Sequence, residues 1–458
     1  MPALAVGKDI SYLEERRSHD NDSETSDDDE DNDESSLVRL LDSVLDSKSE
    51  VLPDLDINLS SLPRLPNFYD FCFNPTWGIG QAPFSRQMAI ALNLLSEWCP
   101  KCSKRDISNL EDVPLDFPSE DFPSRVQLLE FGVCPKCGRT RRKLYNKGHL
   151  NPYVEMNGVA GQRSGKSALL SLVIPYLLHQ WVKLERPAQQ LGLLNNTILS
   201  GTLCGMTFTK ACDLLWNPTK NLIQSYPWFS YLHETLDWYG EKKGVELYKF
   251  HSNVLNYTFR NLLLHPAGPN KRTLRGDTRF LTVLDELGWF PHGEDNDERE
   301  RASANEVYVA LDRSLKTVRS ASRKLLKRGK LDCPSAYSLN ISSPSSYYDK
   351  IMSLYRTYKG SRQVYVWKLA TWEMNPTFSE EDFAKEYLED PMKADRDFGA
   401  NPPKSSNPWI GGDEELDKLS RSRNRVKYTY KESHTPSGKR QRYAQLMHGK
   451  YELSLIHI

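Results

Sequence analysis

A run of small residues followed by lysine and serine is the most informative feature of this 458-residue chain. Residues 160–167 read AGQRSGKS, which matches the phosphate loop G-x4-G-K-[ST] except that Ala160 replaces the first glycine. In such a loop, backbone N–H groups surround phosphate oxygens, the lysine reaches the β and γ phosphates, and the hydroxyl binds Mg²⁺. We therefore predict that ATP is bound by Ala160, Gly161, Gln162, Arg163, Ser164, Gly165, Lys166 and Ser167.

Two adjacent carboxylates follow an apolar run further along the chain. Residues 281–286 read LTVLDE, which predicts a strand ending in Asp285 and Glu286. In hydrolases of nucleoside triphosphates, one such carboxylate holds the metal and the other activates water. The two motifs together predict ATP hydrolysis, with Mg²⁺ held by Ser167 and Asp285. The alternative is a coincidental Gly-Lys-Ser loop, but a strand before the loop and a helix after it favour the nucleotide site.

Four of the eight cysteines form two short knuckles, CPKC at 99–102 and CPKCG at 134–138, with 31 residues between them. This spacing matches a tetrahedral zinc site with four thiolate ligands, which leaves no open position for catalysis. We predict a structural Zn²⁺ in an inserted ribbon over about 97–143. Lysines and arginines cluster around the knuckles, and they either contact DNA phosphates or form a solvated rim. The predicted zinc ligands are Cys99, Cys102, Cys134 and Cys137.

The net charge of −1 hides an uneven distribution. Residues 1–60 carry 18 acidic and 5 basic side chains, so the remaining residues carry about +12. An acidic segment with few apolar residues cannot offset its ordering entropy, so we predict a disordered tail over 1–60. It is either a solvated tail or an arm that competes with nucleic acid or docks a partner. The basic body suits a polyanion, and neither a signal peptide nor a membrane span is expected.

Hydrophobic patterning predicts strands that alternate with helices. Strands are expected over 153–159, 197–203, 280–284, 337–344 and 364–369, with a hairpin over 253–266. Helices are expected from about Ser85, from 168, over 209–216 and over 305–328. The last is amphipathic, with Val307, Leu311, Leu315 and Val318 on its buried face, and its basic second half either contacts DNA or is a solvated face. This alternation predicts an α/β P-loop fold, with a mainly parallel central sheet flanked by helices over 61–400.

From about residue 83 to 402 the chain resembles the large subunit of tailed-phage terminases, the motor that packages DNA into a prohead. The resemblance rests on the phosphate loop, the carboxylate pair and four further segments. These are RTLRGDTR at 272–279, SSP at 342–344, ATWEMNP at 370–376 and RDFGANP at 396–402. One departure is that many members have an arginine at the position of Gln162, whereas the arginine here is Arg163.

The resemblance implies further roles. Glu286 would orient the attacking water, and Arg275 would complete a neighbouring subunit's site as an arginine finger, with Arg272 and Arg279 as rivals. Gln87 resembles the glutamine that reads adenine. The coupling of hydrolysis to movement would fall to Ser342, Ser343 and Pro344, for which a plain turn at a strand end is the alternative.

The family normally carries an RNase H-like nuclease after the ATPase domain, with two metals held by carboxylates. Residues 401–452 lack the expected start of that domain, so we interpret them as a linker or a truncated beginning, without endonuclease activity. The last residues, 453–458 (LSLIHI), resemble a translated sequencing adapter and are excluded from fold prediction.

These features predict an ATP-driven motor for double-stranded viral DNA. The implied partners are the DNA, a portal protein, a small terminase subunit and further copies of the chain in a ring, without a membrane, in the host cytoplasm. Two alternatives remain: a zinc-ribbon helicase-type ATPase, which would need aromatic stacking residues, and a zinc-ribbon DNA adaptor with a degenerate nucleotide loop.

Overall fold

The computed structural model describes residues 57, 59, 61–270, 274, 276–290, 302–329 and 334–403, together with three strands between 427 and 457. The chain divides into two units, residues 1–403 and 404–458, and each unit is described by itself. The acidic tail predicted over 1–60 lies almost entirely outside the described residues.

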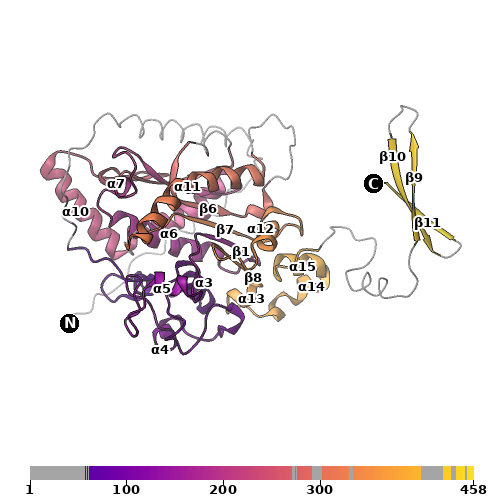
Figure 1. The fold of residues 1–458 in the computed structure, drawn as a ribbon, viewed down its shortest axis with the longest axis horizontal. Helices are drawn as coiled ribbons and strands as arrows, with labels where there is room; N and C mark the ends of the chain where they lie inside the picture. Colours follow the sequence, from indigo (N-terminus) through magenta and orange to yellow (C-terminus); the bar gives the residue numbers. More distant parts are fainter. Residues whose placement is uncertain are drawn as a thin grey trace, which may run out of the picture. The chain divides into compact units, whose positions relative to one another are not determined.

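Eight strands of the first unit form one sheet, in the order β3-β4-β5-β2-β6-β7-β1-β8 (Figure 1). The five strands β2, β6, β7, β1 and β8 are parallel to their neighbours, β5 is parallel to β2, and β3 and β4 add an antiparallel edge. The predicted fold class, a mainly parallel sheet with helices, is therefore confirmed. The strand bounds are β1 Glu155–Ala160, β2 Leu199–Cys204, β3 Lys249–Phe250, β4 Leu255–Tyr257, β5 Leu262–Ala267, β6 Thr278–Asp285, β7 Tyr337–Ser342 and β8 Val364–Leu369.

Helices cover both faces of the sheet. On β1, Met156 and Val159 point to opposite faces because side chains alternate along a strand, and they belong to two different clusters of buried residues. The cluster of Met156 includes α6 (Lys166–Val182), and the cluster of Val159 includes α12 (Lys350–Tyr358) and the first half of α11 (Ala304–Lys327). The remaining helices are α2 Phe68–Phe73, α3 Ser85–Leu95, α4 Phe122–Arg125, α5 Arg141–Asn146, α7 Pro187–Gln190, α8 Phe208–Ala211, α9 Asn217–Ser225, α10 Pro227–Lys243, α13 Thr371–Met374, α14 Ala384–Glu389 and α15 Pro391–Asp397.

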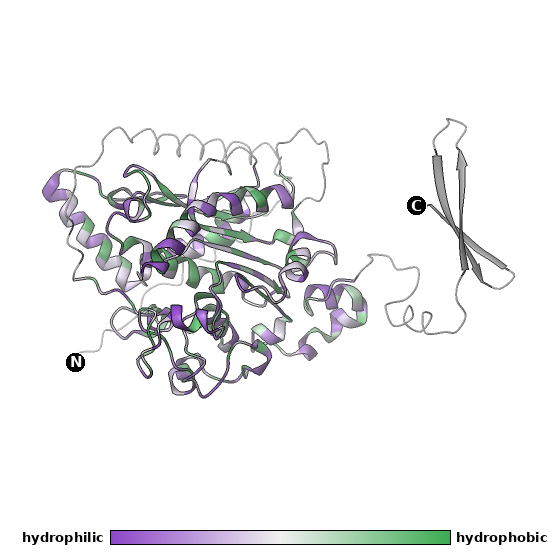
Figure 2. Cartoon of the chain, in the orientation of Figure 1, coloured by the Kyte–Doolittle hydropathy of each residue, from purple (hydrophilic) through white to green (hydrophobic). Residues whose placement is uncertain are grey.

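Helix α11 is the helix predicted over 305–328. It begins with a capping box in which the Ser303 hydroxyl accepts from the Glu306 N–H and the Glu306 carboxylate accepts from the Ser303 N–H. Its sequence repeats apolar residues at helical spacing, and hydropathy follows that pattern, with the charged positions on the outer side (Figure 2). Each fully buried aliphatic side chain contributes roughly 1.5–3 kcal/mol. The buried stripe is the predicted one: Val307, Leu311, Leu315 and Val318.

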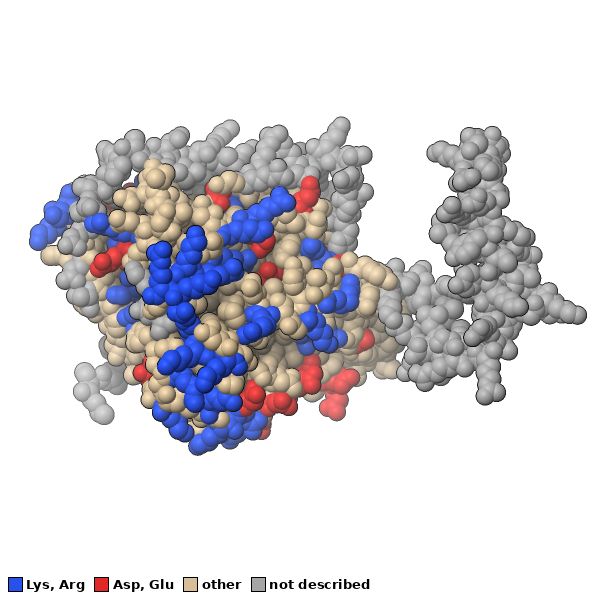
Figure 3. Space-filling model, in the orientation of Figure 1, with Lys and Arg blue, Asp and Glu red and all other residues tan. Residues whose placement is uncertain are grey.

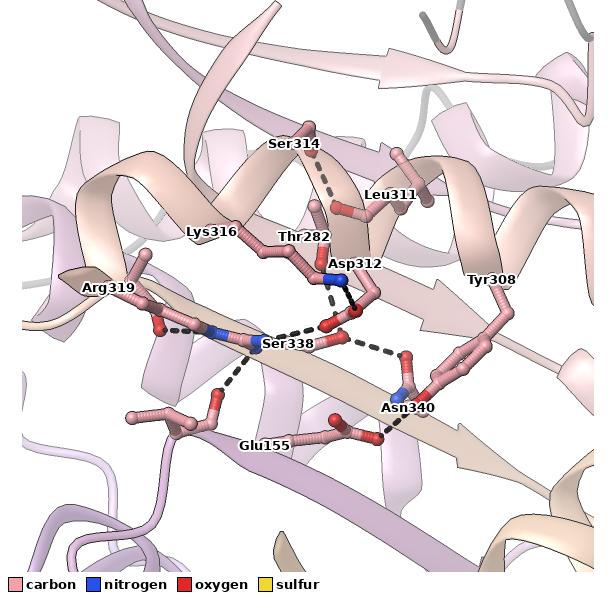
Figure 4. Close-up of polar contacts among 12 residues, drawn as sticks. Glu155, Thr282, Tyr308, Leu311, Asp312, Ser314, Lys316, Arg319, Ser338 and Asn340 are labelled. Carbon is pink, nitrogen blue, oxygen red and sulfur yellow. Dashed lines mark hydrogen bonds and ion pairs between the residues drawn. The ribbon is translucent and has the colours of Figure 1, made fainter. Parts of the chain in front are cut away.

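A polar network lies between α11 and the centre of the sheet (Figure 4). Asn340 of β7 donates to Asn157 of β1 over 2.8 Å, and Asn157 donates to Glu155 over 2.9 Å. The Tyr308 hydroxyl of α11 also donates to Glu155, over 2.9 Å. Buried polar groups cost little when they are paired in this way. The network therefore fixes α11 on the strands that carry the candidate site.

Arg319 attaches the second half of α11 to the amino ends of two strands (Figure 4). Its guanidinium pairs with Asp312 at 2.7 Å and donates to the backbone oxygens of Ala336 and Val154, at 3.2 and 2.9 Å. These oxygens immediately precede β7 and β1. Helix α11 therefore runs from the carboxyl edge of the sheet to its amino edge.

The second unit contains a three-stranded antiparallel sheet in the order β11-β10-β9. The sequence predicts no strands in this region. The acidic stretch at 411–417 lies outside the described residues, and β11 includes most of the residues 453–458 that the sequence excludes from fold prediction. The strand bounds are β9 Lys427–His434, β10 Arg440–His448 and β11 Tyr451–His457.

Candidate functional site

The predicted phosphate loop connects β1, which ends at Ala160, to α6, which begins at Lys166. Gly165 precedes the helix with φ = 85°, and Arg163 also has a positive φ, 60°. These left-handed positions turn the chain so that the loop closes before the helix starts. The first N–H groups of α6 lack intrahelical acceptors and favour an anion at this end. The strand–loop–helix order expected for a phosphate site is therefore present.

The loop is braced by the two segments that follow β8. The Gly161 N–H donates to Leu369 O over 3.2 Å, the Gln162 N–H donates to Asp397 O over 2.6 Å, and the Thr371 hydroxyl donates to Gln162 O over 2.7 Å. A side chain at Gly161 would meet the Thr371 hydroxyl at 2.3 Å, so the close approach requires glycine. The segments at 370–376 and 396–402 thus hold the loop from its outer side.

The two predicted motifs meet at the carboxyl edge of the sheet. Asp285 ends β6 and is 3% exposed, and Glu286 follows it with φ = 54°. This left-handed residue turns the Glu286 carboxylate toward the phosphate loop, where it lies 3.4 Å from the Lys166 ammonium. Lys166 also donates to Gly161 O over 3.2 Å. The loop that carries the lysine follows β1, the carboxylate pair lies at the end of β6, and these two strands flank β7.

Glu286 is also held by the polar turn after β7. Its Oε2 accepts from the Ser343 N–H and the Ser343 hydroxyl, both at 3.0 Å, and lies 3.1 Å from the Ser342 hydroxyl. The Ser342 proton can instead serve Ser343 O, at 2.6 Å. Pro344 is buried behind this turn. The structure therefore brings Ser342 and Ser343 of the predicted coupling segment to the Glu286 carboxylate.

The surroundings of Asp285 suit a cation. Burial, followed by the neighbouring charge of Glu286, raises the pKa of Asp285 to about 7, and the charge of Lys166 opposes this rise. A divalent ion beside Asp285 would offset both causes and keep the carboxylate ionised. Within the loop, the Ser164 hydroxyl is buried and has no hydrogen-bond partner. This unsatisfied donor, the free helix N–H groups and the hydroxyl of half-exposed Ser167 fit a phosphate and a hard metal ion.

Gln87 lies beneath the phosphate loop. It is 2% exposed, its amide nitrogen donates to Gly165 O over 3.2 Å, and its oxygen accepts from the Phe84 N–H over 3.1 Å. A Cβ at Gly165 would approach this amide nitrogen to 2.7 Å. Both ends of the Gln87 amide are thus engaged in positioning the loop and the start of α3, while its adenine-reading role stays a prediction.

The structure describes one of the three candidates for the arginine finger. Arg275 and Arg272 lie outside the described residues. Arg279 is fully buried on β6, where it donates to Thr202 at 2.7 Å and to Leu274 O at 3.0 Å and pairs with Asp277 at 2.8 Å. A finger must reach another subunit, so Arg279 is wrong as a candidate; it stabilises the amino end of β6 instead.

Arg396 and Trp289 also belong to the site, although no role was predicted for them. The Trp289 indole N–H donates to the Ser343 hydroxyl over 3.3 Å, and the Arg396 guanidinium carbon lies 5.5 Å from the centre of the Trp289 ring. Arg396 also pairs with Asp397 at 2.8 Å. Their side chains connect the segment that braces the phosphate loop to the turn that holds Glu286. The position of Arg396 in a segment already singled out was the available signal.

The four predicted zinc ligands come together. Their sulfur atoms all lie within 4.8 Å of one another, and the Cys99 and Cys137 sulfurs are 3.9 Å apart. A tetrahedral ion with Zn–S bonds of about 2.3 Å requires sulfurs about 3.8 Å apart, so the cluster could hold zinc. The knuckles turn through hydrogen bonds from the Cys102 N–H to Cys99 O and from the Gly138 N–H to Cys134 O.

Glu97 joins the cysteine ribbon to the P-loop core, and sequence reasoning missed it. Its buried carboxylate accepts from the Phe68 N–H at 2.7 Å and from the Tyr176 hydroxyl of α6 at 2.5 Å, and it lies 3.8 Å from the Arg141 guanidinium. Burial raises the pKa of Glu97, and Arg141 and these donors oppose the rise. No sequence pattern marks a residue whose partners lie up to 79 positions away.

A family model of a P-loop domain matches the chain. The family described as "Uncharacterized protein MJ0330, N-terminal P-loop domain" matches residues 140–399, which is more than half of the chain. No curated protein matches the chain.

Among the solved structures that the chain resembles are large terminases of phages. The large terminase ATPase domain of Thermus phage P74-26 is 12% identical, with coverage of 57% of this chain and 98% of that one and a TM-score of 0.33. The large terminase of bacteriophage HK97 is 11% identical, with coverage of 69% and 65% and a TM-score of 0.36. The large terminase of another thermophilic bacteriophage, in complex with ADP, is 10% identical, with coverage of 67% and 63% and a TM-score of 0.32. The chain thus spans less than two thirds of each of the last two terminases. No described helix is long and apolar enough to cross a membrane.

Proposed function

The chain belongs to the family of the MJ0330 N-terminal P-loop domain, and we propose that it is the ATP-hydrolysing motor subunit of a terminase, which moves double-stranded viral DNA into a prohead. The observation that carries the proposal is the meeting of Lys166, Asp285 and Glu286 at one edge of the sheet. The terminase assignment is supported by the set of motifs that the sequence shares with terminase large subunits. It includes the loop-bracing segments at 370–376 and 396–402 and the SSP turn at 342–344.

In this proposal the phosphate loop binds the triphosphate of ATP. Loop N–H groups and the unsatisfied Ser164 hydroxyl would donate to phosphate oxygens, and Lys166 would exchange its contact with Glu286 for the β and γ phosphates. Ser167 and Asp285 would hold Mg²⁺, which supplies charge neutralisation on the phosphates. Gln87 would contact the adenine base. Against this role, both ends of its amide already form hydrogen bonds within the protein.

Glu286 would orient the attacking water and accept its proton. The Glu286 carboxylate faces the loop and is restrained by its contacts with Ser343 and Lys166. Withdrawal of Lys166 toward phosphate would leave the serine contacts as the remaining restraint. The turn at 342–344 would then report the state of the nucleotide to β7, which is the coupling role assigned to Ser342, Ser343 and Pro344.

The remaining assignments extend the same proposal. Arg275 would act as the finger in a neighbouring copy of the chain within a ring, and the cysteine cluster would hold a structural Zn²⁺. A portal protein and a small terminase subunit would be partners in the host cytoplasm. Endonuclease activity is not assigned to these residues, of which 61–400 form the proposed ATPase domain, 97–143 the ribbon and 1–60 an acidic tail.

ATP turnover measured with matched DNA substrates tests the proposal. The purified chain should hydrolyse ATP in a Mg²⁺-dependent manner, and linear duplex DNA should stimulate turnover more than single-stranded DNA of the same sequence. A third-strand displacement assay would report movement along the duplex without strand separation. Stimulation by single strands together with unwinding would favour a helicase-type ATPase, and no ATP turnover under any condition would contradict the proposal.

A further inference from the structure

Lysine and arginine side chains gather on one face of the first unit, over α11 and α5 (Figure 3). On α11 they recur on the side opposite the buried stripe. On α5 and the segment just after it they project from the end of the cysteine ribbon. We call this surface the basic band, and its exposed members are Arg313, Lys316, Arg323, Lys324, Lys327, Arg142, Lys143, Lys147 and Arg362.

Hydrogen bonds between distant parts of the chain make the band one surface. The Arg142 guanidinium of α5 donates to Lys327 O at the end of α11, over 2.7 Å. Arg362, before β8, donates to Tyr145 O of α5 over 2.9 Å. The ribbon, the helix and the edge of the sheet therefore present their charges together. The two basic groups that the sequence left as separate candidates are neighbours in space.

The charges of the band are largely uncompensated. Among the described residues, the carboxylate paired with a band member is that of Asp312, 3.7 Å from Lys316, and it also pairs with Arg319. The pKa of His149, beside α5, is lowered by desolvation and then by the positive charges of Lys101, Lys147 and Arg139. The surface around α5 therefore has a positive electrostatic potential, which attracts a polyanion rather than a neutral partner.

The band lies at the opposite edge of the sheet from the nucleotide site. Lys166 and Glu286 lie where β1 and β6 end, whereas Arg319 fixes the second half of α11 to the residues that precede β1 and β7. A phosphate-bearing partner on the band would thus not compete with ATP. The band is a separate site connected to the first by α11.

We propose that the basic band binds the phosphate backbone of duplex DNA. The α11 stripe from residue 313 to 327 is about 21 Å long, because a helix rises 1.5 Å per residue. This length matches about six base pairs of duplex, which carry about twelve phosphates. The band members are cations that can neutralise a phosphate backbone, and none is an aromatic side chain of the kind on which single-strand binders stack successive bases.

This DNA-binding proposal rests on the proposed function, from which the choice of DNA as the polyanion comes. A DNA-binding assay at several salt concentrations tests the proposal. We compare a fluorescent 30-base-pair duplex with the matching single strand. The variants are R323E/K327E on α11, K143E/K147E on α5 and at the residue that follows it, and the control K385E/K393E on α14 and α15, away from the band in Figure 1. ATP turnover without DNA is measured for each protein.

Each band variant should bind duplex about ten- to a hundredfold more weakly near 0.1 M salt. The slope of log K against log salt should become less steep by about 2, because each lost phosphate contact removes about 0.9. The control and the DNA-independent ATP turnover should match the unmodified chain. The basic band is not the DNA-binding surface if both band variants bind duplex as tightly as the control. The choice of duplex is wrong if the single strand binds more tightly, in which case stacking on exposed Phe131 of the ribbon is the first explanation to examine. A chain that lacks ATP turnover but loses duplex binding in the band variants would contradict only the motor function.

Discussion

The Lys166 ammonium lies 3.4 Å from the Glu286 carboxylate, across the end of β7, and closes the candidate nucleotide site with an ion pair. The lysine side chain is 7% exposed and the glutamate side chain 22%, so water screens the pair only in part. A triphosphate would compete with Glu286 for the same ammonium. We therefore expect the Glu286 carboxylate to stay held until the lysine has another anion to bind.

The two serines of the 342–344 turn should differ in their effect on turnover. Ser343 gives Glu286 both a backbone and a side-chain hydrogen bond, whereas the Ser342 proton can serve Ser343 O instead. A hydrogen bond to a charged group contributes about 1.5–3 kcal/mol. We expect Ser343→Ala to lower kcat by about tenfold or more and Ser342→Ala to lower it less. Equal turnover in both variants and the unmodified chain would contradict the role of the turn.

The cysteine cluster should hold one zinc ion per chain. Metal analysis of the purified protein measures this directly, and Cys134→Ser should lose the metal and lower the midpoint of thermal unfolding, because zinc binding contributes folding free energy. Cys212→Ala, at a half-buried cysteine outside the cluster, is the matched control and should keep its zinc. A protein that is free of zinc yet equally stable would show that the four sulfurs are brought together by folding alone.

Glu97 should be essential for the attachment of the ribbon to α6. Glu97→Ala removes the acceptor for the Phe68 N–H and the Tyr176 hydroxyl and leaves the Arg141 charge without compensation. Removal of one partner from a buried charge pair costs about 3–5 kcal/mol. Denaturant unfolding should show a loss of this size, with Glu130→Ala on the exposed ribbon surface as the control. A loss below about 1 kcal/mol would rule out this attachment.

Stability should fall in mildly acidic solution because of His179. Burial, followed by the charges of Arg64 and Lys183, lowers the pKa of His179 to about 3. The unfolded chain binds a proton near pH 6.5 and the folded chain does not, so the contribution is complete above pH 6.5 and is lost as the pH falls. At pH 5 the loss is about 2 kcal/mol. His179→Gln, which keeps an acceptor for the Leu65 N–H, should lose less stability between pH 7 and 5. Identical losses in the two proteins would exclude His179 as the cause.

The parts of the fold that the sequence predicts are those in which local pattern and tertiary structure agree. The strand before the phosphate loop, the apolar strand that ends at Asp285 and the stripe of α11 from Val307 to Val318 are dictated by burial at a fixed period. The meeting of the cysteine knuckles follows from their spacing. The approach of Glu286 to the phosphate loop follows because parallel strands place their carboxyl ends at the same edge of the sheet.

The features that escaped prediction depend on partners far apart in sequence. The pairing of Asn157 with Asn340 was not predicted, because it depends on adjacent β1 and β7 placing the two amides opposite each other. Arg279 was a rival candidate for the arginine finger, but Thr202 and the chain near Leu274 enclose it. The sequence also could not predict that the two basic segments form one surface, since Arg142 and Lys327, which connect them, are 185 positions apart.

Single-turnover and steady-state ATP hydrolysis by Glu286→Gln, beside Lys166→Ala, is the measurement that tests the central claim most directly. Glutamine keeps the shape of Glu286 but cannot accept a proton, so turnover should fall by about 10²–10⁴-fold while ATP still binds. Lys166→Ala should lose ATP binding as well, because it removes the charge expected to contact the phosphates. Turnover in Glu286→Gln within a few fold of the unmodified chain would contradict the account of the site.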